Sequence, residues 1–70
     1  MLKKVIGKAI RDRRKALNIT QPVLAELADI SLNSLYRFER GESNPTLDLV
    51  EKVITVLGME LKLEAKKIER

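Results

Sequence analysis

The sequence predicts a mostly helical domain of four helices that ends in one short β-strand. Three observations lead to this fold class. Apolar residues recur at helical spacing in four successive segments. Residues that favour helix starts and stops stand between those segments. After Gly58 the apolar period changes to strict alternation, which is typical of a half-buried strand.

The first predicted helix lies in the basic N-terminal segment and ends near Asn18, which can adopt the left-handed conformation that closes a helix. Residues 1–20 contain seven basic residues and a single acidic one, although the whole chain carries a net charge of only +4. Such a segment suits an anionic partner, but charge alone favours a solvated helix face, because basic faces are common on protein surfaces. The stripe expected to face the core is Ile6, Ala9, Ile10, Arg14, Ala16 and Leu17.

The second predicted helix covers residues 21–28. Thr20 is its N-cap, and the proline at position 22 falls in the first turn, where proline is tolerated. Its inner face consists of Leu24, Ala25 and Ala28. Asp29 tolerates the left-handed turn that would follow.

The third predicted helix covers residues 32–40, with Ser31 as N-cap and Gly41 just beyond its end. Its inner face is Leu35, Phe38 and the stem of Glu39. A fourth helix begins after Thr46 and stops at Gly58. Its predicted apolar stripe is Leu47, Val50, Val53, Ile54 and Leu57.

The C-terminal segment alternates, with Met59, Leu61, Leu63 and Ala65 on one side and charged residues on the other. A lone strand leaves backbone groups unpaired on both edges. We therefore expect it to pair with the same strand of a second copy about a two-fold axis, which divides the chain into a domain at 1–58 and a dimerisation segment at 59–70. A fifth helix is the rival interpretation, since Leu61, Ala65 and Ile68 also fit a helical spacing.

Composition excludes several functions. The chain has no Cys and no His, which removes disulfides, thiolate or imidazole metal sites and histidine-based catalysis. An enzyme is thus not expected, and neither is a cofactor. No signal peptide or membrane span is evident, so we expect a cytoplasmic protein. A single Tyr and a single Phe disfavour the stacking surfaces of single-strand RNA readers.

Two short helices joined by a tight turn form the layout of a helix-turn-helix, whose second helix enters the major groove of double-stranded DNA. Asn33 and Arg37 lie four residues apart on its outward face and could read adenine and guanine edges. Leu32 could touch a thymine methyl group and Tyr36 a phosphate or base, although either could instead belong to the core edge. Arg40 is better placed for phosphate.

Two further predictions concern polar residues outside that row. Gln21, at a helix N-terminus, is a candidate phosphate contact or merely a polar residue of the first turn. Arg14 and Glu39 each lie near the apolar side of a helix, where an unpaired charge is costly. We therefore expect them to form a partly buried ion pair that ties the first helix to the third.

Residues 10–58 resemble the Cro/C1-type (XRE-like) helix-turn-helix domains, which have a lambda-repressor-like fold. The matching pieces are "TQ" at 20–21, "LAELA" at 24–28, "FERG" at 38–41, "NPT" at 44–46 and "LG" at 57–58. The resemblance implies a phosphate contact at Gln21, base-facing positions at Leu32, Asn33, Tyr36 and Arg37, and positions near phosphates at Arg40, Ser43 and Asn44. It also implies the pair between Arg14 and Glu39. Arg13 stands where the family is often apolar, so it could cross the core edge or point at DNA.

The strand-like tail is similar to that of HipB-like antitoxins, in which the strands of two subunits pair. The resemblance implies a dimeric repressor that acts on its own operon, with Met59, Leu61 and Leu63 in the dimer interface. The alternative it implies is an antitoxin whose main task is to bind a kinase-like toxin.

Overall fold

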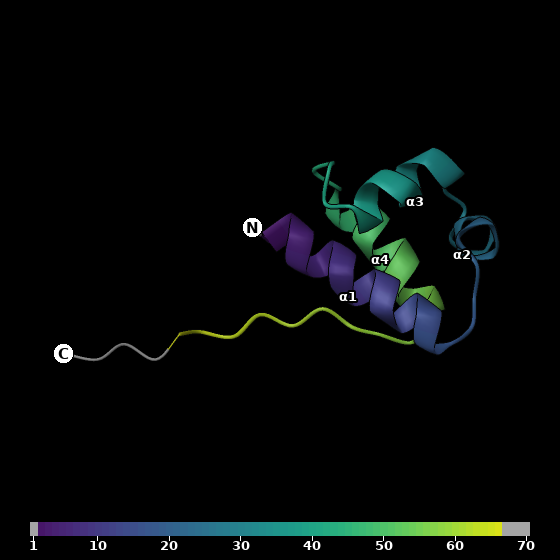
Figure 1. Cartoon of the computed structure of the whole chain (residues 1–70). Helices are drawn as coiled ribbons and strands as arrows, with labels where there is room; N and C mark the ends of the chain where they lie inside the picture. The colour runs from purple at the N-terminus through teal and green to yellow at the C-terminus, as the bar shows by residue number, and fades with distance from the viewer. Residues whose placement is uncertain (1, 67–70) are drawn as a thin grey trace.

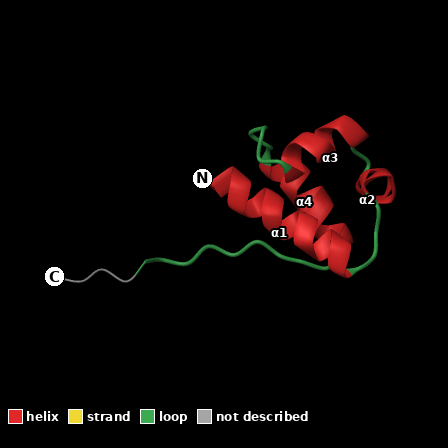
Figure 2. Cartoon of the chain, in the orientation of Figure 1, coloured by secondary structure: helices red, strands yellow, loops and turns green. Residues whose placement is uncertain are grey.

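The computed structural model describes residues 2–66 and confirms the four predicted helices in the predicted order (Figure 1). Short loops join the helices, and the tail after the last helix is also drawn as loop in Figure 2. None of the helices within residues 2–66 is long and apolar enough to cross a membrane. The helices are α1 (Leu2–Ala16), α2 (Gln21–Ala28), α3 (Leu32–Glu39) and α4 (Leu47–Val56).

The three predicted N-caps are confirmed. The hydroxyl of Thr20 accepts a hydrogen bond from the Val23 N–H at 3.4 Å, at the start of α2. Ser31 does the same for Ser34 of α3 at 3.0 Å. Thr46 accepts from Leu49 of α4 at 3.1 Å. Each cap satisfies one of the N–H groups that a helix start leaves without a partner.

The predicted helix ends are confirmed with one shift. Asn18 and Asp29 both have a left-handed backbone with φ of 58°, and Gly41 and Gly58 have φ of 71° and 68°. α3 ends at Glu39, one residue earlier than predicted, because Arg40 is already the C-cap.

The core lies where α1 packs on α3 and where α2 packs on both α3 and α4. Its largest fully buried side chains are Phe38, Ile10, Leu24, Leu35, Leu57 and Val53. The predicted inner faces of α2 and α3 are therefore confirmed.

Parts of the stripes predicted for α1 and α4 are wrong. Leu17 is 40% exposed because α1 has ended before it, and Leu47 is 77% exposed in the first turn of α4. Ala9 and Ala16 are also exposed. An end residue of a helix can lie on the correct side and still project past the neighbouring elements.

Gly7 allows α1 to lie very close to the end of α3. A Cβ atom at this position would collide with the Phe38 carbonyl oxygen and lie 3.0 Å from the Glu39 carbonyl oxygen. The absence of a side chain thus fixes how closely the two helices approach each other.

The tail does not form the predicted strand in this single chain. Within residues 2–66 there is no strand, and residues 59–66 are neither helical nor part of a ladder. The rival fifth helix is likewise not formed over these residues; Ile68, on which it relied, lies outside the described residues. The tail leaves the helices and extends away from them (Figure 1).

Candidate nucleic-acid interface

The two sides of α3 have opposite environments. Leu35 and Phe38 are fully buried, whereas Leu32 and Tyr36 are 47% and 45% exposed. Leu32 and Tyr36 are thus accessible at the edge of the core and are not enclosed in it, and their contact with bases or phosphate stays a prediction. Asn33 and Arg37 are exposed as well. The outward side of α3 is thus an accessible row of one apolar, one amide, one phenol and one guanidinium side chain: Leu32, Asn33, Tyr36 and Arg37.

One surface hollow lies beside α3 toward α1 and the start of α2, and we call it the α1 hollow. Its lining is mostly basic or polar, which suits an anion such as a backbone phosphate. The residues that line it are Arg11, Arg14, Lys15, Gln21, Tyr36, Glu39 and Arg40.

The predicted ion pair between Arg14 and Glu39 is present at the base of this hollow. Arg14 donates from Nε to Oε2 of Glu39 at 2.7 Å and from a terminal nitrogen to Oε1 at 2.9 Å. A third Arg14 donor reaches the Ile19 carbonyl at 3.0 Å. Both residues are buried, at 8% and 6% exposure. The two-pronged geometry joins α1, the loop before α2 and the end of α3.

Gln21 is attached to the same network. Its side-chain Nε2 donates to Oε1 of Glu39 at 3.0 Å. The Gln21 amide is therefore held at the inner wall of the α1 hollow, with one of the two N–H groups of Nε2 bound to protein. Phosphate contact through its other N–H or through the backbone stays a prediction.

Arg40 is held at the rim of the α1 hollow by two exposed neighbours. Its Nε donates to Oε2 of Glu42 at 2.8 Å, and a terminal nitrogen donates to the Tyr36 hydroxyl at 3.0 Å. Its guanidinium carbon also lies 5.2 Å from the Tyr36 ring centre. The hydrogen bond to Glu42 is the main reason that the pKa of Arg40 is raised above its usual value. Glu42 thereby competes with any phosphate for this guanidinium.

A second hollow, the loop hollow, lies on the other side of α3 against the start of α4. It brings together three of the predicted site residues, Arg37, Ser43 and Asn44. The complete lining is Ser34, Arg37, Ser43, Asn44, Pro45, Thr46 and Leu49. All the predicted DNA-binding residues thus lie on α3 or in a hollow beside it.

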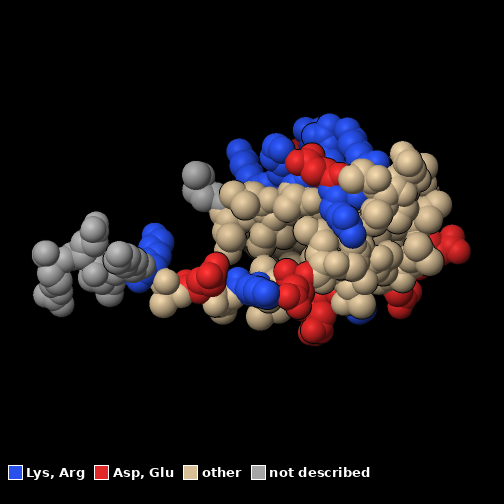
Figure 3. Space-filling model, turned by 90° about the horizontal axis from the view of Figure 1, so that it is seen from below, with Lys and Arg blue, Asp and Glu red and all other residues tan. Residues whose placement is uncertain are grey.

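Charge is unevenly distributed over the face of the molecule seen in Figure 3. Lys and Arg side chains gather along one edge of the face seen in Figure 3, and acidic side chains predominate along the opposite edge. One α1 cation is neutralised, because Lys8 donates to Asp12 at 2.7 Å. That hydrogen bond is the main cause that lowers the pKa of Asp12 below its usual value.

Arg13 is bound to the end of α4. Its Nε donates to the Leu57 carbonyl at 3.0 Å, at the C-terminal end of α4. Of the two alternatives drawn from the sequence, the structure favours the one in which Arg13 crosses the core edge. The cation also suits the negative end of the helix dipole.

Sequence reasoning missed four residues that shape this interface. Arg11 and Lys15 line the α1 hollow, and their spacing of four residues could have placed them together on α1. An isolated glycine within a predicted helix was the available signal for Gly7. Glu42 had no sequence signal, because its partner Arg40 lies across a turn.

Comparisons with known proteins agree with this geometry. A family model described as helix-turn-helix matches residues 10–63. An uncharacterized HTH-type transcriptional regulator of Methanothermobacter thermautotrophicus is 35% identical over 51 residues, which are 73% of this chain and 74% of that protein. The crystal structure of the clp gene regulator ClgR from Corynebacterium glutamicum matches with a TM-score of 0.81 and 30% identity, over 84% of this chain and 63% of that one.

Other relatives are longer than this chain. The immunity repressor protein of Bacillus phage phi105 is 38% identical over 56 residues, covering 80% of this chain and 39% of the repressor. A protein of Methanococcus vannielii named as an HTH-type transcriptional regulatory protein is 34% identical over 79% of this chain, which spans only 17% of that protein.

Proposed function

The chain belongs to the Cro/C1-type helix-turn-helix family of DNA-binding transcription regulators, and from this premise we propose that it is a sequence-specific autorepressor that binds a palindromic operator as a homodimer. The observation that carries the proposal is the accessible row on α3, flanked on both sides by polar hollows. We place the protein in the cytoplasm, where operator DNA lies.

The row has the chemistry of base readout. Asn33 can bond an adenine edge with both its amide groups, and Arg37 can do the same with guanine. Leu32 offers an apolar contact for a thymine methyl group. Tyr36, held by Arg40, lies between this row and the α1 hollow.

The two hollows are suited to the two phosphate backbones that border a major groove. On the α1 side, Arg11, Lys15 and Arg40 supply charge, while Gln21 supplies N–H groups at a helix start. On the other side, Ser43 and Asn44 supply neutral donors beside Arg37. Binding should therefore weaken steeply as salt concentration rises, because phosphate contacts release counterions.

A homodimer would place two α3 helices on half-sites about 34 Å apart on one face of the duplex. The name of the phage phi105 protein, an immunity repressor, supports repression as the direction of control.

Binding selection on random duplex DNA tests the proposal. We expect enrichment of an inverted repeat with half-site centres about one helical turn, or a multiple of it, apart. The double variant Asn33→Ala/Arg37→Ala is the control: it should keep its fold and lose the enriched sequence. A selection that returns no motif, or only a single unrepeated half-site, contradicts sequence-specific binding or the dimer, respectively.

The antitoxin role is a second proposal, supported by the resemblance of the alternating tail to HipB-like proteins and by the exposure of Leu61 and Leu63, at 49% and 95%. The adjacent gene tests it. A kinase-like protein that co-purifies with this chain and is inhibited by it would support the antitoxin role. If the adjacent genes encode no toxin, the antitoxin role loses its basis and the DNA-binding proposal remains intact.

A further inference from the structure

The hydroxyl of Tyr36 makes a hydrogen bond whose direction is fixed by the chemistry of its partner. A terminal nitrogen of Arg40 lies 3.0 Å from the hydroxyl oxygen, and the guanidinium carbon lies 5.2 Å from the ring centre. A guanidinium group has several N–H donors and no acceptor. Arg40 is therefore the donor and Tyr36 the acceptor, so the hydroxyl keeps its own proton for another group.

The charge of Arg40 also influences where that proton points. The hydroxyl hydrogen carries a partial positive charge, so the neighbouring guanidinium repels it and favours a direction away from Arg40. Within residues 2–66 no protein group accepts a hydrogen bond from this hydroxyl, and Tyr36 is 45% exposed. The phenol thus offers an oriented donor to a molecule outside the domain.

A donor distinguishes among the groups that a DNA duplex presents. Phosphate oxygens only accept hydrogen bonds, whereas the base edges in the major groove include the amino groups of adenine and cytosine, which only donate. Tyr36 can therefore pair with a phosphate beside any sequence, but with only some of the groups on the base edges.

The position of Tyr36 favours phosphate over the remaining base acceptors. Its side chain lines the α1 hollow together with the cations Arg11, Lys15 and Arg40. Arg37, the candidate reader of guanine, lines the loop hollow on the other side of α3. Three cations around one hollow favour an acceptor that carries negative charge. The phosphate backbone is the part of DNA with that charge.

We propose that Tyr36 donates to a backbone phosphate of the operator and that Arg40 is the positioning residue that orients its hydroxyl. This proposal rests on the DNA-binding function proposed above and assigns a ligand to one residue of that site. It departs from the family resemblance, which implies a base-facing position for Tyr36. Base readout then falls to Leu32, Asn33 and Arg37.

Tyr36→Phe in the full chain tests the contact, because it removes the hydroxyl and keeps the ring. Binding is measured to the selected operator and to an unrelated duplex of the same length. Phosphate contacts carry no sequence information, so we expect the affinity for both duplexes to fall by the same factor, roughly three- to tenfold. The slope of affinity against salt concentration should not change, since the phenol is uncharged.

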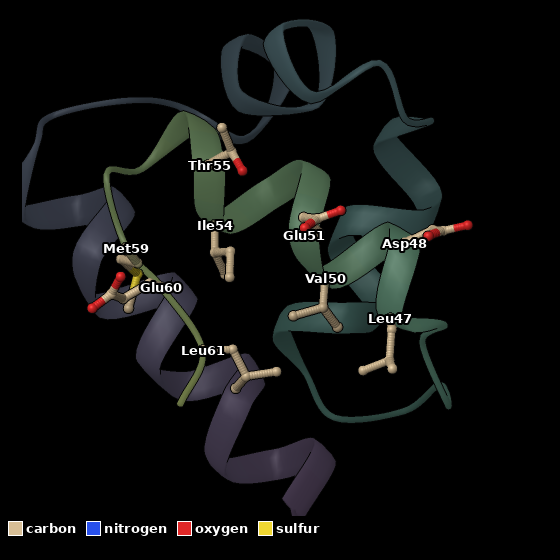
Figure 4. A pocket seen from close by; sticks show the side chains of 9 residues that line it. All are labelled: Leu47, Asp48, Val50, Glu51, Ile54, Thr55, Met59, Glu60 and Leu61. Carbon is tan, nitrogen blue, oxygen red and sulfur yellow. The ribbon is translucent and has the colours of Figure 1, made fainter. Parts of the chain in front are cut away.

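Thr55→Val is the matched control, because it also removes one hydroxyl. Thr55, labelled in Figure 4, is an exposed residue of α4 that lines neither hollow. Its affinity for both duplexes should stay within about twofold of the natural chain, as expected for a surface change away from the interface. Equal binding by Tyr36→Phe and Thr55→Val would overturn the phosphate contact.

Operators in which one phosphate at a time is replaced by an uncharged methylphosphonate locate the contact. At one position in the half-site, the replacement should weaken Tyr36→Phe at least roughly threefold less than it weakens the natural chain, because the two changes remove the same hydrogen bond. Coupling of Tyr36→Phe to a deazapurine that lacks the N7 acceptor, in place of any methylphosphonate, would make Tyr36 a base contact and overturn the assignment.

The positioning role of Arg40 is tested by its coupling to the hydroxyl. Arg40→Met keeps the apolar stem and removes both the charge and the donor. In the Arg40→Met background, Tyr36→Phe should weaken binding by less than about twofold, because the hydroxyl is no longer oriented. Arg40→Lys keeps a charged donor and should restore part of the coupling. An undiminished effect of Tyr36→Phe beside Arg40→Met would overturn the positioning role.

A spectroscopic measurement on the free chain separates positioning from a general loss of charge. Tyr36 is the only tyrosine and the chain has no tryptophan, so the tyrosine doublet of the Raman spectrum reports on this hydroxyl alone. The doublet distinguishes a phenol that accepts a hydrogen bond from one that does not. We expect an accepting phenol in the natural chain and a shifted doublet in Arg40→Met. An identical doublet in both chains would overturn the orientation by Arg40.

Failure of this assignment and failure of the proposed function give different results. A chain that selects an operator and binds it unchanged as Tyr36→Phe overturns the assignment and leaves the function standing. A chain that binds all duplexes equally, and loses affinity equally as Tyr36→Phe, supports the phosphate contact and contradicts sequence-specific binding. A chain that binds no duplex DNA overturns both.

Discussion

At the residue scale, several polar side chains of the candidate interface are already bound by other protein groups before any DNA arrives. Glu39 binds both Arg14 and Gln21, and Arg40 binds both Tyr36 and Glu42. Such contacts reduce the conformational entropy that a side chain loses when it meets a phosphate or base. Glu42 also introduces a carboxylate where the proposed function requires phosphate. The two substitutions predicted at this scale should therefore change the affinity for DNA in opposite directions.

Arg37→Ala should weaken operator binding by about 1–3 kcal/mol and relax the preference at one base pair. The reason is the loss of a bidentate contact to a base edge. Binding to a set of operators with single substitutions measures both effects. Lys52→Ala, an exposed α4 residue that lines neither hollow, is the matched control. An equal loss on every sequence would make Arg37 a phosphate contact instead.

Glu42→Gln should tighten DNA binding roughly two- to fivefold at low salt, because it frees the Arg40 guanidinium and removes a charge that repels phosphate. The same variant should make the salt dependence of binding steeper. Glu26→Gln, an exposed α2 carboxylate that lines neither hollow, is the control for net charge. Weaker binding by Glu42→Gln would mean that the carboxylate positions Arg40 more than it obstructs it.

At the scale of elements, the position of α3 depends on a contact with the backbone of Gly7, which has no side chain. α1 approaches the last turn of α3 at Gly7, and the Arg14 pair joins the same two helices further along α1. The outward row of α3 is therefore aimed by α1. A change in the approach of α1 should alter both stability and DNA binding.

Gly7→Ala should lower the free energy of unfolding by about 1–3 kcal/mol, because the new Cβ meets the carbonyl oxygens of α3. Alanine is better than glycine in a helix by about 1 kcal/mol, so a gain in stability would mean that α1 can move away at little cost. Urea denaturation measures the effect as a lower midpoint with an unchanged slope. Val5→Ala, on the exposed side of the same helix, is the control.

At the scale of the whole molecule, the functions proposed above require two surfaces. The α3 row and its two hollows form one, and the side of the domain that carries α4 and the start of the tail forms the other. A dimer joined through the tails would leave both α3 rows free. The link between the two surfaces is thus geometric, since pairing of the tails would set the separation of the reading helices.

Deletion of residues 59–70 should yield a monomer with reduced operator affinity. The reason is the loss of the segment that we propose to pair across the two-fold axis. Light scattering gives the mass, and titration with a one-half-site and a two-half-site duplex gives the affinity. The deleted chain should bind both duplexes equally per half-site. A full dimer after the deletion would move the interface to α4 itself.

Sequence reasoning predicted local features more accurately than surfaces. Thr20, Ser31 and Thr46 cap helices through bonds to N–H groups three residues away, so the few residues around each cap suffice to identify it. The prediction that Leu47 faces the core was wrong, because the exposure of this side chain depends on whether another element covers it. The row on α3 was found because a helix with one apolar side must present its other side outward.

The sequence by itself determined the four helices, their N-caps and the buried side of α3, since these depend on periodicity and on caps within a few residues. Only the tertiary structure decided that Gln21 binds Glu39, that Arg13 binds α4 and that Gly7 touches α3, because each contact joins residues distant in the chain. In the tertiary structure the tail is also extended, and its first residues line a groove beside α4. A strand needs a second strand for its hydrogen bonds, and the described part of this single chain does not supply one.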